Sequence, residues 1–248
     1  MTAESARVST FEHAGATLVV EEHGAGPRSI VLLHGIGMGR TVFGDLVAIL
    51  RDDYRTLAID LPGYGAAPEP PRTPTIERTA DLVAALLRER ALGDVTLVGH
   101  SMGSQVAAEV AVRHPSLVDR LVLAAPTVNA DERSAARQIL RLAQDLAIES
   151  PRVVARGARE YLRAGPNLRR KMRAILLHRP ELAYPRVAAP TLVLRGALDY
   201  VSPQAWCEAV ASLLPDGRLV EIEGHGHETM IRDAAPAAAA IREFVEST

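Results

Sequence analysis

A short apolar run that leads into a Gly-x-Ser-x-Gly turn constrains this chain more than any other feature. Residues 95–98 have the pattern of a buried strand, Gly99-His100-Ser101-Met102-Gly103 follows, and an apolar helix pattern comes next. A residue at the tip of so tight a turn needs small neighbours two positions before and after it, and both are glycine. The turn lifts the Ser101 hydroxyl clear of the sheet, and the first amides of the helix point at the same place. This context favours Ser101 as a nucleophile over an ordinary structural turn.

Alternating strand and helix patterns predict an α/β fold with a mostly parallel central sheet flanked by helices. Most of the apolar runs are too continuous to be half exposed, which indicates strands covered on both faces. Helix-period segments between them predict right-handed crossovers. The expected strands are residues 30–33, 56–59, 95–98, 121–123, 191–194 and 219–222, and the expected helices are 42–50, 76–92, 102–114, 204–214 and 234–245. Residues 8–11 and 17–22 are expected to pair as an antiparallel hairpin at one edge.

The interval between residues 126 and 185 breaks this alternation. It has no strand pattern but three amphipathic stretches, 135–148, 152–162 and 168–178, which predict a helical insertion over the sheet. We therefore expect a core of residues 1–126 and 187–248 and a helical lid (cap) of residues 127–186.

The predicted lid is also basic. Residues 130–186 carry 13 Arg or Lys against 6 Asp or Glu. The simplest interpretation is a solvated helix face. The alternative is that some arginines face inward and bind a substrate carboxylate or phosphate; the candidates are Arg137, Arg141, Arg156, Arg159, Arg163 and Arg173.

Composition narrows the classes of protein that this chain can represent. Its 248 residues can bury a large core in one domain with one insertion. A formal net charge of −2 gives no reason to expect a nucleic-acid partner. The single cysteine, Cys207, excludes an internal disulfide, the first residues lack a signal-peptide pattern, and no run approaches the roughly 18 apolar residues of a membrane span. We expect a cytoplasmic monomer or homodimer with no membrane partner.

Five motifs, in this order along the chain, resemble those of the α/β-hydrolase fold family, specifically its small lidded, carboxylesterase-like serine hydrolases. The resemblance extends from about residue 17 to residue 244. The motifs are His34-Gly35-Ile36-Gly37, Asp60-Leu61-Pro62-Gly63-Tyr64-Gly65, the Ser101 turn, Gly196-Ala197-Leu198-Asp199 and Gly224-His225-Gly226-His227. The order nucleophile, acid, base is the one expected for this family.

The resemblance implies a catalytic triad of Ser101, Asp199 and His227. A serine hydroxyl needs a base to remove its proton, and imidazole has the pKa to do so near neutrality. His227 holds the position of the family's catalytic histidine, with His225 as its rival. The acid should follow a strand and hold the imidazole tautomer. Asp199 does so, whereas the continuation after Asp60 marks that residue as a structural turn residue.

The backbone amides of Ile36 and Met102 are expected to form an oxyanion hole. Each such donor lowers the barrier by roughly 3–4 kcal/mol. Glycines on both sides of Ile36 let its loop bend back toward the nucleophile. The expected substrate-binding residues, around a mainly aliphatic pocket, are Gly35, Gly37, Met38, Phe43 and Tyr200.

The family resemblance implies cleavage of a small or medium carboxylic ester, thioester or lactone through an acyl-enzyme at Ser101, with no cofactor and no metal. Serine at position 101 argues against haloalkane dehalogenases and epoxide hydrolases, which carry aspartate there. Three alternatives stay open: a perhydrolase, a lyase, synthase or C–C hydrolase that uses the same triad on an anionic substrate, and a ligand-binding protein with negligible turnover. Apart from a second copy of the chain, the expected partner is a small-molecule substrate, and an anionic substrate stays open.

Overall fold

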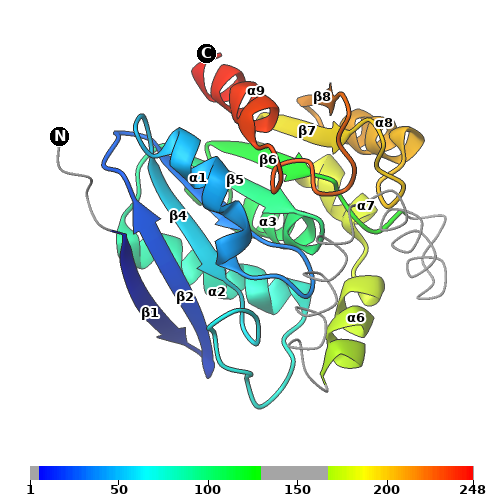
Figure 1. The fold of residues 1–248 in the computed structure, drawn as a ribbon. Helices are drawn as coiled ribbons and strands as arrows, with labels where there is room; N and C mark the ends of the chain where they lie inside the picture. Colours follow the sequence, from blue (N-terminus) through cyan, green and yellow to red (C-terminus); the bar gives the residue numbers. More distant parts are fainter. Residues whose placement is uncertain (1–5, 130–166, 248) are drawn as a thin grey trace.

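The computed structural model describes residues 6–129 and 167–247, which fold around one mixed sheet (Figure 1). The strand order is β1-β2-β4-β3-β5-β6-β7-β8. The strands are β1 (Arg7–His13), β2 (Ala16–His23), β3 (Ser29–Leu33), β4 (Arg55–Asp60), β5 (Val95–His100), β6 (Arg120–Ala124), β7 (Thr191–Gly196) and β8 (Gly217–Ile222). β3 to β8 run parallel, and β1 and β2 form the predicted antiparallel edge hairpin, with β2 antiparallel to β4. The predicted α/β fold is confirmed.

Helices cover both faces of this sheet (Figure 1). One face carries α2 (Ile76–Arg90), α3 (Met102–Arg113) and α8 (Gln204–Leu213), and the other carries α1 (Gly44–Leu50) and α9 (Ala235–Glu246). Because successive side chains of a strand point to opposite faces, β3 contributes to two separate cores. Val31 and Leu33 pack under α2 and α3, whereas Ile30 and Leu32 pack under α1 and α9.

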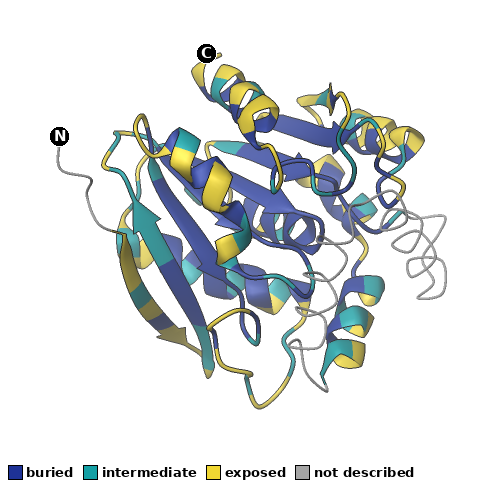
Figure 2. Ribbon diagram, in the orientation of Figure 1, coloured by how far each residue is buried: buried dark blue, intermediate teal, exposed yellow. Residues whose placement is uncertain are grey.

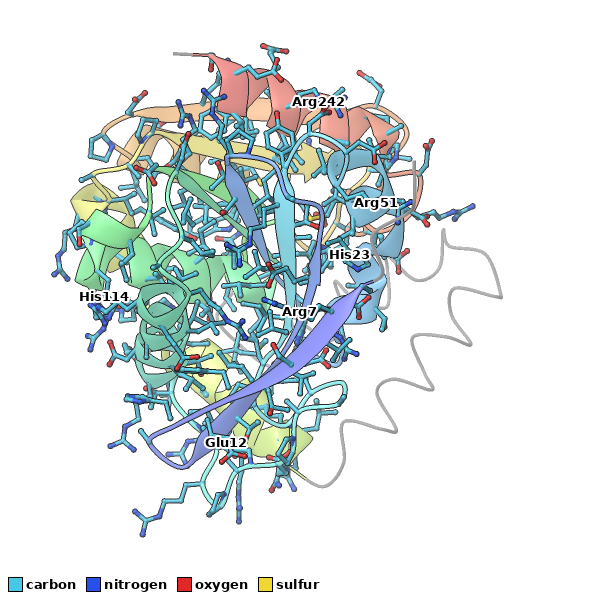
Figure 3. All side chains as sticks on the ribbon, turned by 90° about the vertical axis from the view of Figure 1, so that its left-hand side faces the viewer. Arg7, Glu12, His23, Arg51, His114 and Arg242 are labelled. Carbon is cyan, nitrogen blue, oxygen red and sulfur yellow. The ribbon has the colours of Figure 1, made fainter. Side chains whose placement is uncertain are left out.

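The central strands are buried on both faces, and the edges are not (Figure 2). β8 is half exposed because it closes the sheet on one side. At the other edge β1 is mostly exposed and buries only Phe11, and Figure 3 looks directly at this strand, with Arg7 and Glu12 on it. Arg7 pairs with Glu22 of β2 at 3.1 Å. Charged side chains on an edge strand disfavour pairing with a second sheet.

The chain between β6 and β7 contains no strand in its described part. That part forms α6 (Leu168–Leu177), α7 (Pro180–Ala183) and the short 3-10 helix η4 (Tyr184–Arg186). The third amphipathic stretch is therefore helical, as predicted. The other two, residues 135–148 and 152–162, lie outside the described residues, and the bounds of a lid stay a prediction. No helix within residues 6–129 and 167–247 is both long enough and apolar enough to cross a membrane.

Candidate active site

The turn between β5 and α3 holds Ser101 in an unusual backbone conformation. Its φ and ψ are 54° and −117°, and its amide donates to the carbonyl of Ala124 at 2.9 Å. The flanking glycines are required because a Cβ on Gly99 would lie 2.2 Å from the carbonyl oxygen of Gly103, and one on Gly103 would lie 2.2 Å from that of Leu33. Strain of this kind at a non-glycine residue is typical of a functional site.

The structure brings Ser101, His227 and Asp199 together from three separate loops. His227 Nε2 lies 3.1 Å from Ser101 Oγ, and His227 Nδ1 lies 3.0 Å from Asp199 Oδ2. All three residues are buried. The histidine can therefore contact the hydroxyl with one nitrogen while the carboxylate holds the other, which is the arrangement that activates a serine.

Asp199 is ionised in spite of its burial. Burial by itself would raise the pKa of this carboxyl, but attraction to His227 and the hydrogen bond with it act in the opposite direction. The amides of Val201 and Ser202 each donate to Asp199 Oδ1 at 2.8 Å, which favours the charged form further. The net result is a pKa below the usual value, so the carboxylate can stabilise a positive charge on His227.

The alternative base, His225, and the alternative acid, Asp60, have other roles in the structure. His225 is fixed by backbone, since its ring nitrogens lie 2.9 Å and 3.2 Å from the carbonyl oxygens of Glu223 and Asp233. Asp60 is fully buried, pairs with the Arg40 guanidinium and accepts the amide of Ala66 at 2.8 Å. Among the described residues, Ser101 is not a hydrogen-bond partner of either side chain.

Two further buried histidines hold the loops around the site. His34 Nδ1 donates to the carbonyl of Gly35 at 2.7 Å, and its Nε2 accepts the amide of Leu61 at 3.1 Å. His100 Nε2 lies 2.8 Å from the carbonyl oxygen of His227. Burial lowers the pKa of both rings, that of His100 to about 3, so both are neutral and serve as hydrogen-bonding supports.

The two amides expected in the oxyanion hole are available for a ligand. Within the described part of the chain, neither the Ile36 nor the Met102 amide donates to a protein acceptor. Both residues line the same cavity as Ser101. Met102 is the first residue of α3, where helix amides have no intrahelical partner and carry partial positive charge.

A cavity of about 100 Å³ opens at Ser101 and His227. Of the predicted substrate-binding residues, Gly35 and Met38 line it. Gly37 does not, and Tyr200 is 44% exposed and outside the lining. Sequence reasoning missed five lining residues, which come from the β6 and β7 loops and from α6: Thr127, Val128, Met172, Ile175 and Val201. Four of them are apolar and Thr127 belongs to none of the motifs, so the sequence gave no signal to separate them from core residues.

The structure corrects the expectation that Phe43 is a substrate-binding residue. It ends the 3-10 helix η1 (Arg40–Phe43), and its ring is completely buried in the core under α1 and α9. Phe43 belongs to the same buried core as Leu46 and Leu50, whereas Met102 belongs to the core on the opposite face of the sheet. Phe43 is therefore a core residue and does not reach the cavity.

The basic side chains of the insertion are in part outside the described residues. Arg137, Arg141, Arg156, Arg159 and Arg163 fall there, and Arg173 of α6 is exposed and does not line the cavity. Within residues 6–129 and 167–247, no group of three or more His, Cys, Asp or Glu side chains is placed to hold a metal ion.

The doubly covered sheet, the strained serine turn and the Ser–His–Asp chain define the class of the α/β hydrolases. A model of the alpha/beta hydrolase family matches residues 30–241. The chain is 31% identical to a pimeloyl-[acyl-carrier protein] methyl ester esterase of Edwardsiella ictaluri, over 90% of this chain and 95% of the relative. The enzyme of the same name from Chromobacterium violaceum is 29% identical, over 93% and 98%.

Solved structures agree with this fold. The crystal structure of E-2-(acetamidomethylene)succinate hydrolase superimposes with a TM-score of 0.80 at 23% identity, covering 98% of this chain and all of that one. Because the family model matches most of its length, the chain belongs to the α/β-hydrolase family.

Proposed function

We propose that this chain is a serine esterase that cleaves a small or medium carboxylic ester, thioester or lactone through an acyl-enzyme at Ser101. The observation that carries the proposal is the buried chain of contacts from Ser101 Oγ through His227 to Asp199, at 3.1 Å and 3.0 Å. It lies at the wall of an open cavity beside two amides with no acceptor in the described residues.

The reaction follows from this geometry. His227 Nε2 takes the proton of Ser101 as Oγ attacks the ester carbonyl, and Asp199 stabilises the imidazolium. The negative charge that forms on the carbonyl oxygen is held by the amides of Ile36 and Met102. His227 then gives the proton to the leaving alcohol or thiol. A water molecule, activated by the same histidine, attacks the acyl-enzyme and releases the acid.

The lining of the cavity supports an uncharged acyl group. Ile36, Val128, Ile175 and Val201 provide aliphatic contacts, and Met38, Met102 and Met172 add adaptable ones. No arginine is among the lining residues that the structure describes.

The relatives named as methyl ester esterases support ester cleavage rather than the lyase or C–C hydrolase alternatives. Met172 and Ile175 belong to α6, which supports the assignment of residues 127–186 as a lid over the site.

The test is intact-mass analysis after treatment with a fluorophosphonate, together with hydrolysis of a panel of p-nitrophenyl esters. The wild-type protein should gain one adduct and hydrolyse the shorter esters, and Ser101→Ala should gain none. We expect Ser101→Ala to lower turnover by on the order of 10⁴-fold or more. A folded wild-type protein without adduct or turnover would overturn the proposal and favour a ligand-binding protein. An adduct without hydrolysis of any ester would favour a lyase.

A further inference from the structure

One buried amide side chain on α3 contacts two parts of the wall of the catalytic cavity. Gln105 lies one helical turn beyond Ser101 and is completely buried. Its Nε2 donates to the carbonyl of Thr127 at 2.9 Å and to that of Ile175 at 3.4 Å. Thr127 follows β6 and Ile175 belongs to α6, and both line the cavity. Gln105 itself is not among the described lining residues, so its effect on a bound substrate is indirect.

Only the nitrogen end of this amide can make the two contacts. A carbonyl oxygen accepts hydrogen bonds and does not donate them, and the NH2 group has one N–H bond for each of the two carbonyls. The Oε1 atom of Gln105 is buried and has no hydrogen-bond partner among the described residues. An unpaired buried oxygen is costly. An apolar side chain of the same length would avoid that cost, so the two hydrogen bonds of the nitrogen are what glutamine adds here.

The segment after β6 is held by side chains from two other parts of the chain. The carbonyl of Pro126 accepts the Ser202 hydroxyl and the Trp206 indole N–H, each at 2.9 Å. The next carbonyl, that of Thr127, accepts from Gln105. The position of residues 126–128 at the cavity therefore depends on α3 as well as on the loop that carries the proposed acid.

The helix α6 is anchored near both of its ends by polar side chains. Lys171, which is buried, pairs with Glu69 at 2.8 Å, and His178, at the end of the helix, lies 2.9 Å from Glu109 of α3. The contact with Gln105 lies between these anchors, at the part of the helix that lines the cavity. One amide on α3 is therefore a contact that both wall segments share.

We propose that Gln105 is a positioning residue that limits the size of the acyl group accepted at Ser101, by holding residues 126–128 and α6 together at the cavity. This inference rests on the proposed function and deepens it. Because Gln105 lies on the helix that begins at the nucleophile turn, it holds both wall segments relative to Ser101. The aliphatic side chains of Val128 and Ile175 then bound a cavity of about 100 Å³, which favours esters with short acyl chains.

The test measures kcat and KM for p-nitrophenyl esters from acetate to octanoate in the wild-type protein and in Gln105→Met. Methionine keeps the length of glutamine and has no N–H to donate. The wild-type protein should prefer the short acyl chains. In Gln105→Met the ratio of kcat/KM for octanoate to that for acetate should rise by about fivefold or more, the order of magnitude of one hydrogen bond. The rise should come chiefly from a lower KM for octanoate, because the wall can then open around the chain.

The matched control is Thr56→Val. The hydroxyl of Thr56 on β4 is another buried donor to a backbone carbonyl, that of His23 at 3.3 Å, beside the edge hairpin. Its loss should leave the ratio of octanoate to acetate unchanged. Thermal unfolding establishes that both variants are folded. If Gln105→Met does not fold, Gln105→Asn makes the same comparison, because its amide is one methylene shorter and falls short of the two carbonyls.

An unchanged or lower ratio in a folded Gln105 variant would overturn the proposal, and so would an equal rise in Thr56→Val. A wild-type protein that prefers octanoate to acetate would contradict it as well. A change in kcat alone, with KM unaltered, would place Gln105 in control of Ser101 instead of the wall and would also overturn it. Failure of the proposed function is distinct, since hydrolysis of the acetate and the fluorophosphonate adduct report it in the wild-type protein independently of chain length.

Discussion

His100 Nε2 lies 2.8 Å from the carbonyl oxygen of His227, and the two ring centres are 5.2 Å apart. A carbonyl only accepts hydrogen bonds, so Nε2 carries the proton of a neutral His100 ring. The residue before the nucleophile therefore fixes the loop that carries the proposed base, although the two residues are 127 positions apart. This single contact ties the spacing of Ser101 and His227 to the strand that ends at His100.

Replacing His100 by leucine should lower kcat by about tenfold or more with little change in KM. The variant His100→Leu removes the donor that His100 offers to the carbonyl of His227 and lets its loop shift, and small displacements of a catalytic group are costly. The variant His100→Gln, which can still donate, should retain more activity. Steady-state kinetics on a p-nitrophenyl ester checks this, and equal activity of the two variants would contradict a positioning role.

The same histidine predicts a loss of stability in mild acid. Burial, and then repulsion from His227, lowers the pKa of His100 to about 3, whereas an unfolded histidine titrates near 6.5. The unfolded chain therefore binds the extra proton, so stability falls as the pH drops below about 6.5 toward 3. Between pH 7 and pH 5 this group alone should lower the free energy of unfolding by about 2 kcal/mol.

Denaturant unfolding at pH 7 and pH 5 measures this loss. His100→Gln should show a smaller loss over this interval than the wild-type protein. The control is His13→Gln, which changes an exposed histidine on β1 and should leave the difference as it is. Asp199 adds nothing in this window, because a carboxyl with a lowered pKa loses its stabilising effect only at lower pH. Equal losses in His100→Gln and wild type would contradict the assignment of a buried neutral ring.

Asp199→Asn should reduce kcat by on the order of 10³–10⁴-fold while leaving the fold intact. The amide oxygen can still accept the amides of Val201 and Ser202, so the loop keeps its shape. The amide nitrogen, however, would face His227 Nδ1 as a donor and stabilise the tautomer that cannot accept the serine proton. The rate of fluorophosphonate labelling should fall in parallel with kcat. Labelling at the wild-type rate would exclude Asp199 as the orienting acid.

The motifs and their order, through the resemblance to a known family, were enough to predict the fold and the meeting of Ser101 with His227 and Asp199. An apolar strand pattern followed by a Gly-containing turn marks the point where the chain leaves a parallel sheet. The carboxyl ends of all such strands lie along the same side of the sheet. Asp199 and His227 each follow the end of a strand, β7 and β8, which is consistent with the triad that the family resemblance implied.

The direction of single side chains was not predictable in the same way. Phe43 lies close in sequence to the Ile36 loop, but the 3-10 turn that carries it faces the opposite core. Lys171 and Gly63 are 108 positions apart, and only the packing of α6 on the loop after β4 brings them together. Such contacts depend on how helices dock, which composition and periodicity do not encode.

The glycine before Ile36 gives a test of how closely the proposed oxyanion loop approaches the nucleophile. A Cβ on Gly35 would lie 3.1 Å from Ser101 Cβ and 3.3 Å from His100 Nδ1, closer than ordinary carbon contacts. The strained turn fixes Ser101, so the loop must give way, and Gly35→Ala should lower kcat by about 10- to 100-fold.

The control for Gly35→Ala is Gly44→Ala at the start of α1, where a Cβ meets nothing within 4 Å. This variant should keep full activity and gain about 0.4–1 kcal/mol in the free energy of unfolding, since alanine restricts the unfolded chain. Kinetics and denaturant unfolding of the pair separate a local effect on Ser101 from a general effect of an added methyl group. Full activity in a folded Gly35→Ala protein would place the oxyanion loop farther from Ser101 than the structure has it.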